Sequence, residues 1–167
     1  WFVYVPAVVL YLALHNKDDY YRTAIFLCTG MTVFLLVSTF FPNGHHLRPA
    51  VMPRDNIFTQ MVASLYKTDT PTNLWPSIHV YNSLGAHFAL SRSELGRKKW
   101  LRRTSGVLCV SIILATMFLK QHSVFDVLTA FVMAAAMYGI VYHYDVLIYL
   151  KQYRTARRAA RAAHKIR

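Results

Sequence analysis

Residues that could carry phosphoryl chemistry occur in three short clusters that lie far apart in the sequence. The clusters are His45-His46 with Arg48-Pro49, then Pro76-Ser77-Ile78-His79, then Lys120-Gln121-His122 followed by Asp126. Arginine and lysine side chains bind phosphate oxygens, and N–H groups at the start of a helix add further donors. Two imidazoles can supply a nucleophile and a general acid. The clusters together therefore predict transfer of a phosphoryl group.

The spacing of His122 and Asp126 gives the third cluster a specific role. Residues four apart share a face of a helix, so the carboxylate can hold the imidazole in one tautomer and leave its other nitrogen free to attack. An ion pair without a catalytic role has the same spacing, and a single His79 is more often an interior histidine than a catalyst. The prediction therefore depends on all three clusters acting together.

A metal site is the competing interpretation of the same histidines. Zinc takes three or four ligands, and four histidines are expected on one side of the molecule: His45, His46, His79 and His122. The neighbouring arginine and lysine side chains would repel a cation and attract an anion. We therefore expect neither a metal nor another cofactor.

These clusters resemble the three-part signature of the type 2 phosphatidic acid phosphatase superfamily, K-x6-R-P, P-S-G-H and S-R-x5-H-x3-D. Arg48-Pro49 matches the end of the first part, Pro76-Ser77 with His79 matches the second, and His122 with Asp126 matches the third. The resemblance covers about residues 20 to 150. The segments DTPTN through PSIH, and KQHS, are especially similar to a bacterial branch of the family.

The sequence departs from the family pattern at several phosphate ligands. The lysine of the first part falls on Phe41, the glycine of the second is Ile78, and the Ser-Arg pair of the third falls on Ala115-Thr116. Lys120 is the best candidate to replace the missing cations, with Arg54 behind it. The PSIH form is also similar to the inositol-phosphoryl and choline-phosphoryl transferase branch.

The resemblance implies a role for each matching residue. His122 would attack phosphorus, Asp126 would orient His122, and His79 would protonate the leaving oxygen. The phosphoryl oxygens would be held by Arg48, Ser77, Lys120 and Arg54. The expected activity is metal-independent hydrolysis of a lipid phosphate monoester or diphosphate through a phosphohistidine. Transfer to a lipid alcohol and a non-enzymatic transporter or scaffold stay open as alternatives.

Five apolar stretches must position these clusters, at about residues 1–14, 21–41, 77–90, 104–119 and 124–150. None alternates in the manner of a barrel strand, so we predict an all-α polytopic membrane helix bundle with five transmembrane helices. The stretch 77–90 is too polar to face lipid and is expected inside the bundle. The chain begins at Trp1 within an apolar stretch, and the resemblance implies that the first helix of a six-helix core is missing.

Charge predicts the topology of this bundle. The chain is 55% hydrophobic, yet its formal net charge is +12, which suits a membrane protein or a nucleic-acid binder. If the helices alternate, 15 of the 19 Lys and Arg residues lie on the side of the basic tail 151–167. By the positive-inside rule that side is cytoplasmic, and the connection 42–76 faces outward with the active site. Because the cations flank apolar helices, we expect lipids and no nucleic acid as partners.

Overall fold

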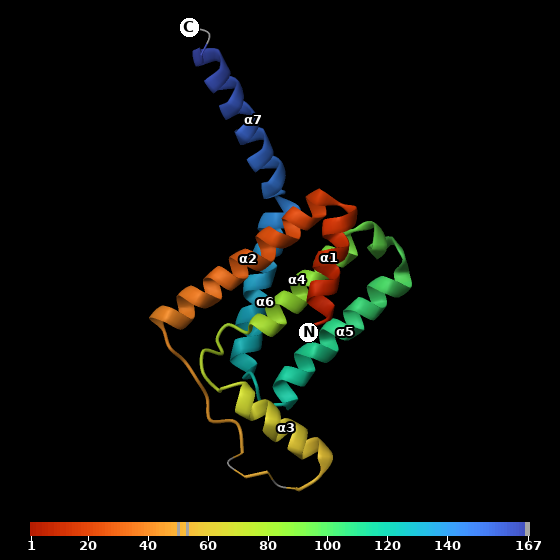
Figure 1. Ribbon diagram of the computed structural model, residues 1–167, viewed down its shortest axis with the longest axis vertical. Helices are drawn as coiled ribbons and strands as arrows, with labels where there is room; N and C mark the ends of the chain where they lie inside the picture. Colours follow the sequence, from red (N-terminus) through yellow and green to blue (C-terminus); the bar gives the residue numbers. More distant parts are fainter. Residues whose placement is uncertain (50, 53, 166–167) are drawn as a thin grey trace.

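Helices form nearly all of the regular structure, as the apolar stretches predict (Figure 1). The computed structural model describes residues 1–49, 51–52 and 54–165; 77% of the chain is helical, and the described residues contain no strand. The α-helices are α1 (Tyr4–His15), α2 (Lys17–Phe40), α3 (Ile57–Thr68), α4 (Ile78–Arg92), α5 (Lys99–Phe118), α6 (Val124–Tyr138) and α7 (Val146–Lys165). A 3₁₀-helix, η1 (Glu94–Arg97), and a π-helix, η2 (Gly139–His143), complete the set.

Helix α4 lies at the centre of the bundle, which confirms the interior position predicted for its polar sequence. It packs against α1, α2, α5 and α6. Its buried residues are Val80, Tyr81, Asn82, Ser83, Leu84, Gly85, Ala86 and Ala89. Small residues along this helix let its neighbours approach closely. The helix that begins at the PSIH motif is therefore held on several sides.

Three helical segments are long and apolar enough to cross a membrane: Lys17–Phe40, Lys99–Phe118 and Val124–His143. Their outer faces carry exposed apolar side chains such as Leu35, Val107 and Val132. With 12 residues in α1 and 15 in α4, these two helices are shorter than the roughly 20 residues that span a bilayer. The apolar helical bundle is thus present, with three spans of full length where five were predicted.

The last apolar stretch, predicted as one helix over 124–150, is divided into two parts. The π-helix ends at His143, and Asp145 adopts a positive φ of 47° before α7 begins. The carboxylate of Asp145 accepts hydrogen bonds from Arg22 Nε at 3.3 Å and from Arg22 Nη2 at 2.7 Å. Composition alone did not reveal this break, which coincides with an ion pair to a distant helix.

The connection 42–76 contains a helix that the sequence analysis did not predict. Asn56 caps the N-terminus of α3, where its side chain accepts from the Thr59 amide and the Thr59 hydroxyl accepts from the Asn56 amide. This reciprocal capping box satisfies two backbone donors at the helix start. None of the residues in α3 is buried, so the helix lies on the outside of the bundle.

The loops divide between two ends of the bundle (Figure 1). The turn between α1 and α2, the 3₁₀-helix η1 and the start of α7 lie at one end. The connection with α3 and the turn between α5 and α6 lie at the other end, while α7 projects away from the bundle. All three sequence clusters therefore lie at the end opposite to α7.

Two glycines permit the close contact between α2 and α4. A Cβ atom on Gly30 would overlap the ring of Tyr81, and one on Gly85 would lie 2.7 Å from the Phe26 ring. Tyr81 is fully buried, stacks on Phe26 with 4.7 Å between ring centroids, and donates its hydroxyl hydrogen to Phe26 O at 2.8 Å. Stacking on Phe26 restrains the face of the Tyr81 ring, and the hydrogen bond restrains its hydroxyl. The ring therefore cannot shift to make room for a side chain at position 30.

We expect Gly30→Ala to destabilise the bundle, although alanine is the better helix former. Forcing a methyl group against Tyr81 should lower the free energy of unfolding by about 1 to 3 kcal/mol. Gly139→Ala is the matched control, because a Cβ there meets no atom within 4 Å. Thermal unfolding of both purified variants in detergent measures the effect. Equal melting temperatures for Gly30→Ala and the unmodified protein would contradict this packing.

Candidate active site

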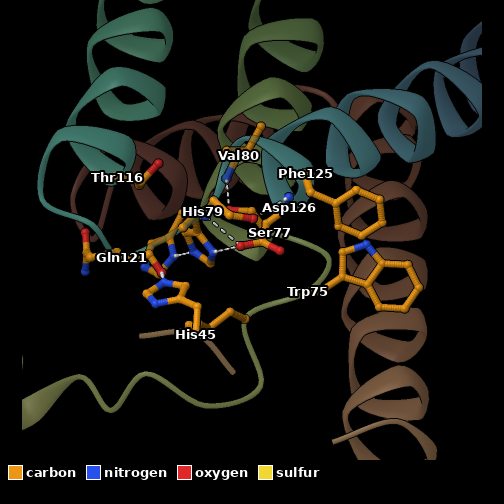
Figure 2. Close-up of polar contacts among 12 residues, drawn as sticks. His45, Trp75, Ser77, His79, Val80, Thr116, Gln121, Phe125 and Asp126 are labelled. Atoms are coloured by element: carbon orange, nitrogen blue, oxygen red, sulfur yellow. Dashed lines mark hydrogen bonds and ion pairs between the residues drawn. The ribbon is translucent and has the colours of Figure 1, made fainter. Parts of the chain in front are cut away.

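The predicted catalytic histidines lie in direct contact, although they are 43 residues apart: Nδ1 of His79 is 3.1 Å from Nε2 of His122. A backbone hydrogen bond, from the Ser77 amide to the Asp126 carbonyl at 3.2 Å, joins the starts of α4 and α6. Figure 2 shows Ser77, His79 and Asp126 gathered at this junction. The second and third sequence clusters therefore converge as predicted.

A tight turn after α5 carries His122 to this junction. The Thr116 carbonyl accepts from the Gln121 amide at 2.9 Å and from the His122 amide at 3.2 Å, and Lys120 reverses the chain with a φ of 50°. Ser123 then caps α6, and its side chain accepts from the Asp126 amide at 3.3 Å. The imidazole of His122 is 4% exposed. Its position is therefore determined by the backbone on both sides.

Asp126 lies beside His122, but not in the relation that was predicted. His122 precedes the N-cap of α6, so the two residues meet across the start of the helix and not along one of its faces. Oδ2 of Asp126 is 3.8 Å from Nδ1 of His122 and accepts from the Ser123 amide at 2.7 Å. The longer of these distances exceeds that of a hydrogen bond. Nδ1 of His122 is buried with no hydrogen-bond partner.

The protonation of His79 follows from its surroundings. Burial, followed by the neighbouring His122, lowers the pKa of His79 to about 4. His79 is the second residue of α4, and α4 is not one of the three candidate spans. Its imidazole is therefore neutral near pH 7 in the ligand-free protein. An anion placed against the ring would favour the protonated form.

His45 attaches the first cluster to the turn that carries His122. The Leu47 amide donates to Nδ1 of His45 at 3.3 Å, so the proton of a neutral ring is on Nε2. Nε2 donates to the Gln121 carbonyl at 3.2 Å. Figure 2 shows His45 next to His79 and Gln121. The sequence analysis placed His45 in the cluster without a role, and its structural role depends on a contact 76 residues away.

Arg48, which was predicted to hold a phosphoryl oxygen, directs its donors at groups within the protein. Its Nη2 donates to Oδ2 of Asp69 at 2.9 Å, and its Nη1 donates to the Asp69 carbonyl and, at 3.4 Å, to the Tyr66 carbonyl. Its Nε donates to the Lys120 carbonyl at 3.5 Å, and the guanidinium lies 4.6 Å from the centre of the Tyr66 ring. Arg48 thus joins the connection to the His122 turn.

The other three predicted phosphate ligands, Ser77, Lys120 and Arg54, lie in three different surroundings. Ser77 is fully buried and caps α4, where its Oγ accepts from the Val80 amide at 3.4 Å. The side chain of Lys120 is exposed in the turn directly before His122. Arg54 lines a cavity that contains no residue of the histidine junction; its other lining residues are Val51, Met52, Asp55, Thr59, Gln60 and Ala63. Lys120 is therefore the predicted cation best placed to approach a ligand at the histidines.

A cavity of about 280 Å³ opens beside Asp126. It is lined by Asn43, Gly44, His45, Leu74, Trp75, Ser123, Phe125 and Asp126. Trp75 and Phe125 stack with 5.8 Å between ring centroids, and Figure 2 shows this pair on one side of the junction. Asn43 holds the Trp75 segment, because its Oδ1 accepts from the Leu74 and Trp75 amides at 2.8 and 2.9 Å. The cavity thus combines an aromatic wall with a carboxylate.

The histidines do not assemble as a set of metal ligands in the part of the chain that the structure describes. No group of three or more His, Cys, Asp or Glu residues there has the spacing to hold a metal ion. His46, which the competing interpretation required, is exposed. The junction offers instead two facing imidazoles, nearby cations and two helix N-termini, a combination that suits an anion.

Comparisons with known proteins add no relative to this geometry. No protein-family model matches the chain, and no curated protein or solved structure is significantly similar to it. The site is therefore interpreted from its own residues.

Proposed function

We propose that this protein is an integral-membrane phosphatase that hydrolyses a phosphate monoester or diphosphate of a lipid through a phosphohistidine on His122. The observation that carries this proposal is the contact between Nε2 of His122 and Nδ1 of His79 at the starts of two helices. A nucleophile and an acid that face each other suit in-line displacement, in which the attacking and leaving atoms lie on opposite sides of phosphorus.

The reaction requires the two imidazoles to separate. At 3.1 Å they leave no room for phosphorus, so the phosphoryl group must enter between them. The lone pair on Nε2 of His122 then forms the N–P bond while the P–O bond to the leaving group breaks, and protonated His79 gives its proton to that oxygen. Asp126 stabilises the positive charge on His122. Water, losing a proton to His79, then attacks phosphorus and breaks the N–P bond.

The bundle supports a location in the membrane with the site on the outer side. Three helical segments have the length and composition of membrane spans, and the junction lies at the end opposite to α7 (Figure 1). Of the 18 Lys and Arg residues in the described part of the chain, 14 belong to the segments at the end of α7. The positive-inside rule then makes α7 and the tail cytoplasmic and the histidine junction extracytoplasmic.

Transfer to a lipid alcohol is the second candidate, because it uses the same residues with another acceptor. The cavity beside Asp126, with its Trp75 and Phe125 wall, has room for an alcohol next to the junction. Comparing product formation with and without an added lipid alcohol separates the two reactions. A transporter or scaffold would retain its function without His122.

We expect His122→Ala to abolish a covalent phosphoryl intermediate. Rapid quenching with a lipid phosphate labelled in its phosphoryl group, followed by analysis in alkali, should show label on the unmodified protein. His46→Ala is the matched control, because His46 belongs to the same cluster but is exposed, and this variant should keep the label. Absence of label from the unmodified protein, or its persistence in His122→Ala, would make the assignment of the nucleophile wrong.

We expect His79→Ala to affect only leaving groups that need a proton. Loss of a general acid should lower kcat/KM for an alkyl phosphate by roughly 10²- to 10⁴-fold. A nitrophenyl phosphate, whose leaving group departs as an anion, should lose much less. The ratio of the two kcat/KM values, measured for His79→Ala and the unmodified protein, tests this role. An equal loss for both substrates would assign His79 to another function.

We expect a cysteine at position 56 to be accessible from outside the cell. Asn56 is exposed at the start of α3, so Asn56→Cys should react with an impermeant thiol reagent in intact cells. Gln152→Cys, on exposed α7, should react only after the cells are broken. Both belong in a chain with Cys28 and Cys109 replaced by serine. The reverse pattern of labelling would invert the topology.

A further inference from the structure

Asp69 brings a negative charge to the side of the junction where a phosphate would be bound. Its Oδ2 accepts from Arg48 at 2.9 Å and from Nε2 of Gln121, the residue before His122, at 3.0 Å. Its charge also raises the pKa of His79, in opposition to burial. The carboxylate is 33% exposed, whereas the Arg48 side chain is 9% exposed. The negative charge of Asp69 is therefore more accessible to a ligand than the positive charge of Arg48.

The formal charges of the side chains around the two imidazoles balance. The charged and titratable side chains there are Arg48 and Lys120, Asp69 and Asp126, and the three imidazoles of His45, His79 and His122; the amino terminus of Trp1, whose ring lies 5.0 Å from that of His79, acts on His79 as a further positive charge. With these imidazoles neutral, the side chains contribute two positive and two negative charges. Four of the donor contacts of Arg48 are already directed at Asp69, Tyr66 and Lys120. Little positive charge is left to neutralise a doubly charged phosphate.

We infer that Asp69 makes the site selective for singly charged phosphate groups, which among the proposed substrates favours a monoester that retains one proton over a diphosphate. This inference rests on the proposed function, because it concerns the substrate of the same histidines. The carboxylate of Asp69 would repel a doubly charged phosphate in this partly buried setting, and the repulsion would weaken the binding of that phosphate. A singly charged group could contact Lys120 and the helix N-termini without that repulsion.

The charge state also fits the proton that the reaction needs. His79 is neutral near pH 7 in the empty site, since its pKa is about 4. A monoester that keeps one proton can give it to His79, and the protonated His79 then passes it to the leaving oxygen. Monoesters lose this proton near a pKa of about 6, so their turnover should fall as pH rises above that value. A phosphodiester has no such proton to lose.

The test compares nitrophenyl phosphate with bis-nitrophenyl phosphate between pH 5 and 8, in the unmodified protein and in Asp69→Asn. We expect the ratio of kcat/KM for the monoester to that for the diester to fall by about tenfold per pH unit above the second pKa of the monoester phosphate in the unmodified protein. Asp69→Asn keeps an acceptor for Arg48 and removes the charge. It should raise that ratio at pH 8 by about tenfold.

Asp55→Asn is the matched control, since Asp55 lies in the same connection and contacts Gln60, away from the junction. It should leave the ratio unchanged. A ratio that does not fall with pH in the unmodified protein, or that Asp69→Asn does not raise, overturns the selectivity while hydrolysis that depends on His122 still supports the proposed function. Absence of hydrolysis dependent on His122 for both compounds contradicts the proposed function itself. If Asp69→Asn does not fold, the pH profile of the unmodified protein still decides.

Discussion

The hydrogen bond from the Ser77 amide to the Asp126 carbonyl, 3.2 Å long, is the interaction on which the site depends. It joins the N-termini of α4 and α6, which belong to different parts of the sequence. His79 follows the first of these atoms by two residues, and His122 precedes the second by four, so one backbone contact brings both imidazoles to the same place. The buried position of α4 among α1, α2, α5 and α6 then prevents the two helix starts from sliding apart.

The polar residues of the connection are used mainly to hold this junction together. Asn43, His45 and Arg48 each direct their hydrogen bonds at backbone carbonyls or amides of distant segments. Buried polar groups must find such partners, because leaving them unpaired costs free energy. The guanidinium of Arg48 is thus occupied by groups of the protein, whereas the side chain of Lys120 is exposed. A charged residue can therefore match a sequence motif and still direct its hydrogen bonds at groups within the protein.

Charge is also organised along the length of the molecule. At the end of α7, acidic residues near the start of α2 pair with cations: Asp18 with Lys151 at 2.6 Å and Asp19 with Arg22 at 3.2 Å. Asp145 pairs with Arg22 as well, and this pairing lowers the pKa of the Asp145 carboxyl. These contacts attach the root of α7 to the bundle at the end opposite to the histidines (Figure 1). The two ends thus differ in charge and in the proposed role.

The sequence by itself determined the helical class and the interior place of α4, because apolar periodicity and polar content report burial directly. The alternation of the helices also predicted that the clusters containing His79 and His122 meet at one end of the bundle. The sequence did not predict α3, the break at Asp145, the partners of Arg48, or the separate cavity that Arg54 lines. Each of these depends on contacts between residues far apart in the chain, such as Arg22 with Asp145 and Arg48 with the Lys120 carbonyl. Only the tertiary structure decides such contacts, because a side chain with several hydrogen-bond donors takes whichever acceptors the packed helices bring within reach.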